Sequence, residues 1–146
     1  MRRMSSGASS ASKPRVLLAA RPLACVPLRE ALAGDAEVVE AHTLEAAVAE
    51  LERAEPIRLV VCTVYFDESR MFDLLKWARA RCAHIPFVCT RALPKDLPRI
   101  SIEAIRIAAD SLGAALFVDV PELARLHGPV EAAERLRRAL LGQIAA

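Results

Sequence analysis

Short apolar runs alternate with longer segments of helical periodicity five times along this 146-residue chain, and no other feature restricts the fold as strongly. The apolar runs predict strands over 16–20, 36–41, 58–63, 85–90 and 114–118. The segments after them predict helices over 23–33, 44–55, 71–82, 102–112 and 130–144. Strands that alternate with helices form parallel sheets through right-handed crossovers, with helices on both faces. We therefore expect one α/β domain, a doubly wound three-layer sandwich of five parallel strands in order 2-1-3-4-5 with five helices.

Polar residues mark the starts of the predicted helices. Thr43 is placed to cap the second helix, and Ser101 is placed to cap the fourth. Either Asp67 or Ser69 can cap the third. These residues set the boundaries between strand, loop and helix on which the rest of the prediction depends.

Three further features refine the expected topology. The run 36–41 is more polar than the others, which predicts a strand nearer the edge of the sheet. Pro27 falls in the first predicted helix, where proline is tolerated only in or near the first turn. The segment 121–128 lacks a long apolar pattern, so we expect a connection that holds at most one short turn.

The charge and the ends of the chain limit the partners that we expect. The net charge of +2 is too small to indicate a nucleic acid or an anionic membrane as partner. Residues 1–13 are rich in Ser and Ala and lack the apolar segment of a secretory signal, so we expect a flexible leader before a single domain over 14–146. No apolar run approaches the length of a membrane span. These features predict a cytoplasmic protein.

The four cysteines form no Cys-x-x-Cys pair, and the three histidines show no metal-ligand spacing to them. The residues concerned are Cys25, Cys62, Cys82, Cys89, His42, His84 and His127. We expect the cysteines to be small buried apolar residues in a reducing compartment, and we expect neither a metal nor a cofactor.

In open parallel sheets, function is concentrated at the carboxyl ends of the strands, so the residue that ends the apolar run 58–63 is the first candidate. That run and its surroundings resemble the receiver domain of bacterial response regulators, and the resemblance covers roughly residues 13–145. The matching segments are 59–63, 72–76, 85–90 and 113–118. The resemblance implies a flavodoxin-like (CheY-like) fold and a role in signal transduction, as in two-component systems.

The functional positions of that family are mostly replaced in this chain. Receivers carry a phosphoacceptor aspartate after the third strand, and that position holds Thr63. The acid pair that binds magnesium is replaced by Ala20 and Arg21, or by Ala19 and Ala20 if the loop is aligned one residue earlier. The lysine position holds Val120, while Thr90 keeps the family's switch hydroxyl. The resemblance therefore implies a degenerate receiver, or pseudo-receiver, without catalytic residues, metal or phosphotransfer.

The charges left near the expected pocket have two interpretations. Arg21 could pair with Asp119 or Asp67 and fill the space of the missing metal, which would lock one conformation or bind a small anion. Alternatively these groups, together with Glu68, are solvated loop charges that contribute little.

We therefore expect a non-enzymatic signalling module that acts by protein–protein contact with a sensor kinase, a regulator or a second copy of itself. The expected homodimer face combines the fourth helix, fifth strand and fifth helix, including Arg106, Asp110 and Arg138. The alternative is a small-ligand or anion sensor near Arg21, Thr63 and Thr90. A small α/β enzyme is a weaker third option, because no base adjoins a nucleophile.

Overall fold

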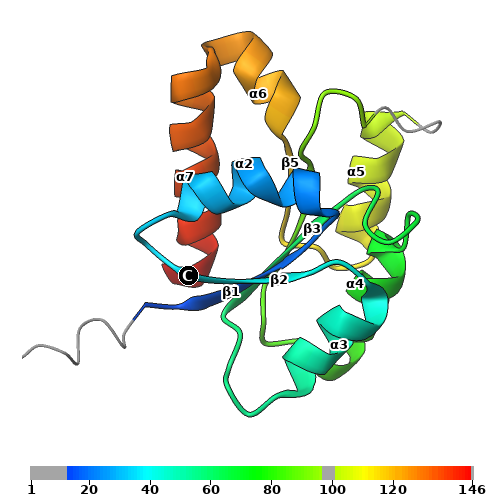
Figure 1. The fold of residues 1–146 in the computed structure, drawn as a ribbon. Coiled ribbons are helices and arrows are strands. Elements are labelled where there is room, and N and C mark those ends of the chain that lie inside the picture. Colours follow the sequence, from blue (N-terminus) through cyan, green and yellow to red (C-terminus); the bar gives the residue numbers. More distant parts are fainter. Residues whose placement is uncertain (1–12, 97–100, 146) are drawn as a thin grey trace, which may run out of the picture.

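A parallel β-sheet forms the middle layer of the protein, which we describe from a computed structural model covering residues 13–96 and 101–145 (Figure 1). Its strands are β1 (Arg15–Ala19), β2 (Glu37–Ala41), β3 (Leu59–Thr63), β4 (Phe87–Arg91) and β5 (Leu116–Asp119). They lie in the order β2-β1-β3-β4-β5 and all pair in parallel. The predicted fold class, strand order and edge position of the second strand are therefore confirmed.

Helices cover both faces of this sheet (Figure 1). They are α2 (Pro22–Leu32), α3 (Leu44–Glu52), α4 (Met71–Arg81), α5 (Ile102–Ser111), α6 (Val120–His127) and α7 (Pro129–Ala145). Buried side chains of α3, α4 and α5 share one apolar cluster, whereas those of α2 and α7 share the other. The three-layer architecture follows, because these five helices hide their apolar faces against one side of the sheet or the other.

The central strands contribute alternate residues to the two apolar clusters. In β3, Val60 and Cys62 join the cluster under α3, α4 and α5, while Leu59 and Val61 join the one under α2 and α7. This alternation is the period of two that a β-strand imposes. All five residues of β3 are buried, so the strand that ends at Thr63 is held from both sides.

Helix α6 is the main departure from the prediction, which placed only a short connection at 121–128. Asp119 caps it, because its Oδ1 accepts a hydrogen bond from the backbone N–H of Glu122 at 3.3 Å. Pro121 lies in the first turn, where proline is tolerated, and Gly128 at φ +81° ends the helix. The described residues thus form six helices rather than the expected five. The eight residues of α6 include none that is buried, which is why apolar periodicity gave no signal.

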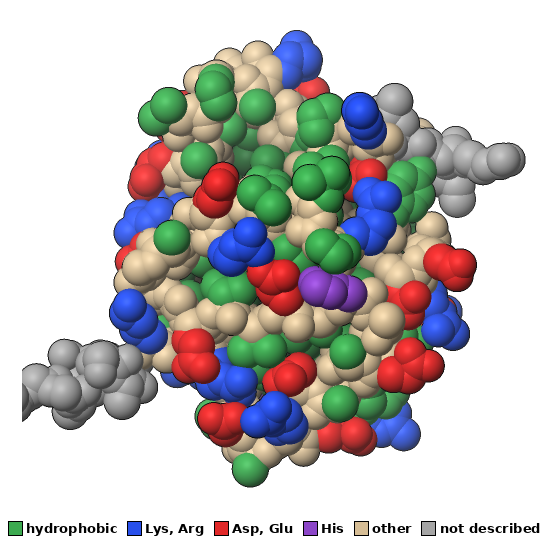
Figure 2. All heavy atoms as spheres, viewed as in Figure 1, with side chains coloured by type: hydrophobic (Ala, Val, Ile, Leu, Met, Phe, Trp, Pro, Cys, Tyr) green, Lys and Arg blue, Asp and Glu red, His purple; other side chains and the backbone are tan. Residues whose placement is uncertain are grey.

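Apolar side chains remain exposed around this added helix. Figure 2 shows hydrophobic side chains gathered over α6 and the neighbouring part of α7. Leu126 of α6 is 56% exposed and Val130 of α7 is 84% exposed. The two helices pack against each other as a hairpin and leave this part of their surface to solvent.

Two predicted caps are confirmed and one is wrong. Thr43 and Ser101 each accept a hydrogen bond from a backbone N–H three residues on, both at 3.1 Å. Neither Asp67 nor Ser69 caps α4; the cap residue is Arg70, without a side-chain hydrogen bond. Asp67 instead accepts a hydrogen bond at 2.8 Å from the N–H of Leu44, the first residue of α3.

Proline also lies deeper in α2 than expected. Pro22 occupies the first turn, whereas Pro27 is inside the helix, in its second turn. The half-buried Pro27 ring therefore costs the helix one backbone hydrogen bond.

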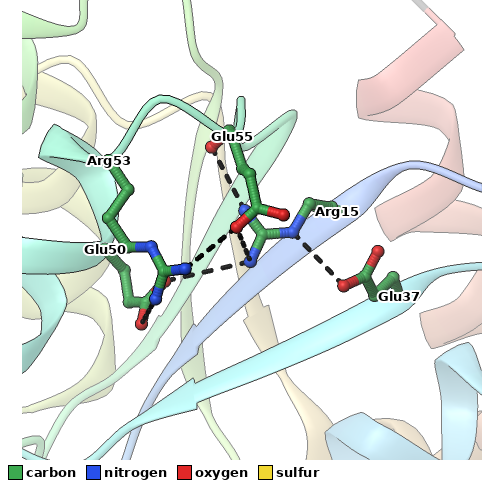
Figure 3. Close-up of polar contacts among 5 residues, drawn as sticks. All are labelled: Arg15, Glu37, Glu50, Arg53 and Glu55. Carbon is green, nitrogen blue, oxygen red and sulfur yellow. Dashed lines mark hydrogen bonds and ion pairs between the residues drawn. The ribbon is translucent and has the colours of Figure 1, made fainter.

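A cluster of charged side chains joins the elements at the amino-terminal ends of strands β1 and β2 (Figure 3). The Nε of Arg15 in β1 lies 3.4 Å from the carboxylate of Glu37 in β2. Its Nη1 donates to the backbone carbonyl of Glu55 at 3.1 Å, and Arg53 pairs with the carboxylate of Glu55 at 3.0 Å. The side chain of Arg15 is only 13% exposed, so this network joins β1, β2 and the segment after α3.

Residues 1–12 of the expected leader lie outside the described residues, so the proposed boundary between leader and domain stays a prediction. Among the described residues, no helix is both long and apolar enough to cross a bilayer.

Candidate functional site

The carboxyl ends of β1, β3 and β4 meet at one edge of the sheet and bring the predicted site residues together. Thr63 and Thr90 are register partners on adjacent strands, and neither side chain is exposed to solvent. The hydroxyl of Thr90 donates to the carbonyl of Cys62 at 3.3 Å. The hydroxyl of Thr63 has no hydrogen-bond partner among the described residues. Ala20, also fully buried, directly follows β1 at the same edge.

Arg21 forms an ion pair with Asp96 across this end of the sheet. The side chain of Asp96 is 4% exposed and that of Arg21 is 46% exposed, so the arginine spans from solvent to a buried carboxylate. The guanidinium carbon of Arg21 also lies 5.7 Å from the centroid of the Tyr65 ring, within cation–π range. The expected partners of Arg21, Asp119 and Asp67, are therefore wrong.

Asp96 differs from the solvated loop charges that one interpretation predicted. Its second carboxylate oxygen, Oδ2, is buried and has no hydrogen-bond partner among the described residues. A buried carboxylate is costly unless it is paired, so the contact with Arg21 compensates part of that cost. Asp96 was not singled out from the sequence, because it lies in a proline-containing loop without a recognisable motif.

Arg91 is a second residue that sequence reasoning missed. The strand was expected to end at Thr90, but Arg91 continues β4 and its side chain is only 11% exposed. Its guanidinium donates to the backbone carbonyls of Asp96 at 2.7 Å and Pro94 at 3.0 Å, and to the carboxylate of Asp119 at 2.8 Å. Arg91 thereby holds the loop that carries Asp96 against the end of β5.

The remaining predicted charges point elsewhere. Asp67 accepts the hydrogen bond from Leu44 at the start of α3. Glu68 is exposed in a loop where Asp67, Glu68 and Ser69 have positive φ values of 44°, 57° and 69°.

Val120 begins α6 and is partly buried against the α2 and α7 cluster. Val118, not Val120, is the register partner of Thr90. The assignment of Val120 to the family's lysine position stays a prediction.

The residues at the carboxyl ends of the strands are poorly suited to bind magnesium or to activate a nucleophile. Magnesium needs several hard oxygen ligands in octahedral geometry. Among the described residues at these strand ends, the carboxylates of Asp96 and Asp119 are each already paired with an arginine, and that of Asp67 accepts the N–H of Leu44. The Thr63 hydroxyl has no neighbouring base that could activate it among the same residues.

The cysteines are free and buried, as expected, but one of them has titratable neighbours. Burial raises the pKa of Cys62 well above its ordinary value and raises that of Cys89 to about 12. Cys25 of α2 lies with Glu40 and His42, so that one ligand atom of each is within 4.8 Å of the others. The sequence shows no ligand spacing between His42 and a cysteine, so it did not reveal this contact, which joins segments that are distant in sequence.

No model of a known protein family matches the chain, and no curated relative of significant similarity was found. Solved structures match its fold. The receiver domain of HemR from Leptospira biflexa, in its non-phosphorylated form, is 26% identical with a TM-score of 0.60, covering 86% of this chain and 94% of that chain. A putative response regulator from Chloroflexus aurantiacus is 21% identical with a TM-score of 0.66, covering 92% and 100%. The phosphorylated cyanobacterial phytochrome response regulator RcpA is 16% identical with a TM-score of 0.68, covering 89% and 95%. The structural neighbours of this chain are thus receiver domains, and its fold is the CheY-like one.

Proposed function

We propose that this chain is a receiver-like signalling module that does not accept a phosphoryl group and acts through protein–protein contact. The observation that carries the proposal is the Arg21–Asp96 ion pair at the same end of the sheet as the buried hydroxyl of Thr63, which has no partner among the described residues. The receiver fold supports a signalling role, and the residues at the carboxyl edge argue against the chemistry by which such a fold usually switches.

Phosphoryl transfer to a receiver needs a carboxylate nucleophile and a metal ion that bridges the attacking and transferring oxygens. Thr63 supplies a neutral hydroxyl without a base, and Ala20 supplies no metal ligand. Arg21 adds positive charge where the metal would bind and already engages Asp96. Each of these substitutions opposes transfer of a phosphoryl group. Together they remove the carboxylate nucleophile and the ligands of the metal ion.

Intact-mass spectrometry after incubation with acetyl phosphate and magnesium tests the first half of the proposal. We expect the mass of the chain to stay unchanged under conditions that label an ordinary receiver domain in a parallel sample. A stoichiometric phosphorylated species would refute it. The variant Thr63→Asp is the informative companion: without acids at Ala20 and Arg21, it too is expected to remain unlabelled.

The contact face that we propose is formed by α5, β5 and α7. β5 is the edge strand there, and a hollow of about 280 Å³ opens beside it between α6 and α7. Arg106 of α5 covers this strand, with its guanidinium carbon 5.0 Å from the centroid of the Phe117 ring and its Nη1 3.3 Å from the Phe117 carbonyl. Asp110 of α5 and Arg138 of α7 add exposed charges of both signs. A face that mixes both signs can pair with its own copy about a two-fold axis, so we propose a second copy as the occupant.

Sedimentation velocity over a range of concentrations tests this contact. We expect a reversible dimer for the natural sequence, a shift to monomer for Asp110→Lys, and no change for the matched control Asp73→Lys on α4, which lies outside the proposed face. A monomer at all concentrations would exclude the second copy. Affinity capture from the native cell, again compared between Asp110→Lys and Asp73→Lys, then tests for a kinase or regulator on the same face.

The alternative, an anion sensor at Arg21, is weakened because Asp96 neutralises the guanidinium. A ligand that binds only the folded chain must raise its melting temperature. A thermal shift with inorganic phosphate that is abolished in Arg21→Ala would favour this alternative over the signalling module.

A further inference from the structure

Cys25, Glu40 and His42 converge beside the end of β2, on the side of the sheet that α2 covers. Glu40 lies in β2 and His42 follows it by two residues, so both side chains point to the same side of the strand. Cys25 reaches that side from α2, and its Sγ lies 3.8 Å from the carbonyl of Ala20. The register of β1 with β2 places Ala19 beside Ala41, which brings the start of α2 over the end of β2.

The geometry of these three side chains is that of a small enclosed cluster with one open side. Nε2 of His42 lies 3.3 Å from Oε1 of Glu40, and the Cys25 sulfur lies within 4.8 Å of both ligand atoms. Cys25 is fully buried, Glu40 is 26% exposed at its side chain and His42 is 45% exposed. The buried sulfur thus forms the floor, and the imidazole forms the rim facing solvent.

From this arrangement we propose that Cys25, Glu40 and His42 bind one zinc-type divalent transition-metal ion, with solvent in the fourth position. Thiolate, carboxylate and imidazole are the three ligand types that zinc accepts in proteins. Sites with three protein ligands keep an open coordination position for water, which the exposed rim allows. The sulfur excludes magnesium and calcium as the preferred ions, because both require oxygen ligands.

The metal-free cluster is held by hydrogen bonds that the ion would replace. Arg29 pairs with the Oε2 side of Glu40, opposite His42. Burial, with the negative charge and hydrogen bond of Glu40, raises the pKa of the Cys25 thiol to about 12, so that the thiol keeps its proton in the absence of metal. Coordination of the sulfur releases that proton to solvent. The titratable and charged groups that face the sulfur are Glu40, His42 and Arg29, and the guanidinium of Arg29 carries a positive charge that repels the ion.

Cobalt(II) is the probe for this site, since thiolate coordination gives a charge-transfer band in the near ultraviolet. We expect the full, reduced chain to bind one cobalt with that band, and zinc to displace it. Cys25→Ser should lose the band, and His42→Asn should weaken binding by at least the roughly 10–100-fold that loss of an outer-shell partner costs. The matched controls Cys82→Ser and His84→Asn should bind as the natural sequence does.

A cobalt band that persists in Cys25→Ser would overturn the proposal, and so would the absence of saturable binding. If Cys25→Ser fails to fold, His42→Asn decides, because its half-exposed ring can be changed without opening the core. The pH dependence gives a separate readout. Release of one thiol proton predicts an apparent affinity that rises about tenfold per pH unit from about pH 7 to about pH 8, where the metal stays in solution. An affinity that is flat over this range contradicts coordination by Cys25.

Discussion

The guanidinium of Arg91 lies 2.8 Å from the carboxylate of Asp119, and the same carboxylate oxygen accepts the hydrogen bond that starts α6. One aspartate therefore joins two roles: counterion of a buried arginine and cap of an added helix. The contact connects β4, β5 and α6 at the carboxyl edge of the sheet.

Replacing Asp119 by Ala removes both roles and should lower the free energy of unfolding by about 2–4 kcal/mol, since a lost cap costs about 1 kcal/mol and a nearly buried unpaired charge costs more. Asp119→Asn should cost less, because asparagine also caps helices. Urea denaturation measures both. Equal losses for the two variants would show that the cap contributes nothing.

The loop after β3 holds three consecutive residues at positive φ, which side chains disfavour. Ser69 at φ +69° should be more stable as glycine, so Ser69→Gly is expected to raise the free energy of unfolding by about 0.5–1 kcal/mol. The matched change Ser111→Gly, at the exposed end of α5, should instead lower it by a similar amount. Chemical denaturation of the pair tests the backbone conformation directly, and a loss in both variants would contradict it.

The ion pair between Arg137 and Asp35, 2.8 Å apart, should make stability depend on acid pH. The hydrogen bond from Arg137, with the charge of that group, holds the pKa of Asp35 below its ordinary value of 3.8. A lowered pKa stabilises the fold above the unfolded value, and the stabilisation is lost as the pH falls through the folded value. The stability difference between the natural chain and Arg137→Met should thus be present at neutral pH and be lost as the pH falls through the folded pKa of Asp35.

Arg138→Met is the control for that measurement, because Arg138 pairs only within α7, with Glu131 and Glu134, among the described residues. A difference for Arg137→Met that persists unchanged at acid pH would indicate lost packing rather than a lost ion pair.

The thiols should be unreactive in the native protein. Burial raises the pKa of Cys25, Cys62 and Cys89, so little thiolate is present at neutral pH, and thiolate is the reacting form. We expect a disulfide reagent to modify these three slowly under native conditions and at once in denaturant. Rapid native modification, located by peptide mass analysis, would contradict their burial. Zinc, if bound as proposed, should slow Cys25 further.

The sheet could be predicted because a strand that is buried on both faces needs an uninterrupted run of mostly apolar residues in the sequence, as in Leu59–Thr63. Helix α6 could not, since its stabilisation comes from the Asp119 cap and from packing on α7, and it buries no residue of its own. Capping predictions succeeded for Thr43 and Ser101, whose bonds are local, and failed for Asp67, whose partner lies 23 residues away.

The candidate site divides in the same way. The meeting of Thr63 and Thr90 follows from strand order alone. The partner of Arg21 does not, because Asp96 is 75 residues distant and its position depends on the path of a loop that Arg91 holds in place. An arginine at the end of a strand suggests solvent, and only the three acceptors around Arg91 reveal why it is buried.

The Arg21–Asp96 ion pair has a consequence in time. The phosphorylated state of a switch has a limited lifetime, because the phosphoryl group is added by a donor and is lost by hydrolysis. The Arg21–Asp96 ion pair forms within one chain without a donor. It therefore has no such lifetime and does not record whether a stimulus has occurred. Under the proposed function, the strength of the signal is therefore a matter of dosage, set by how many molecules the cell makes and how quickly it removes them.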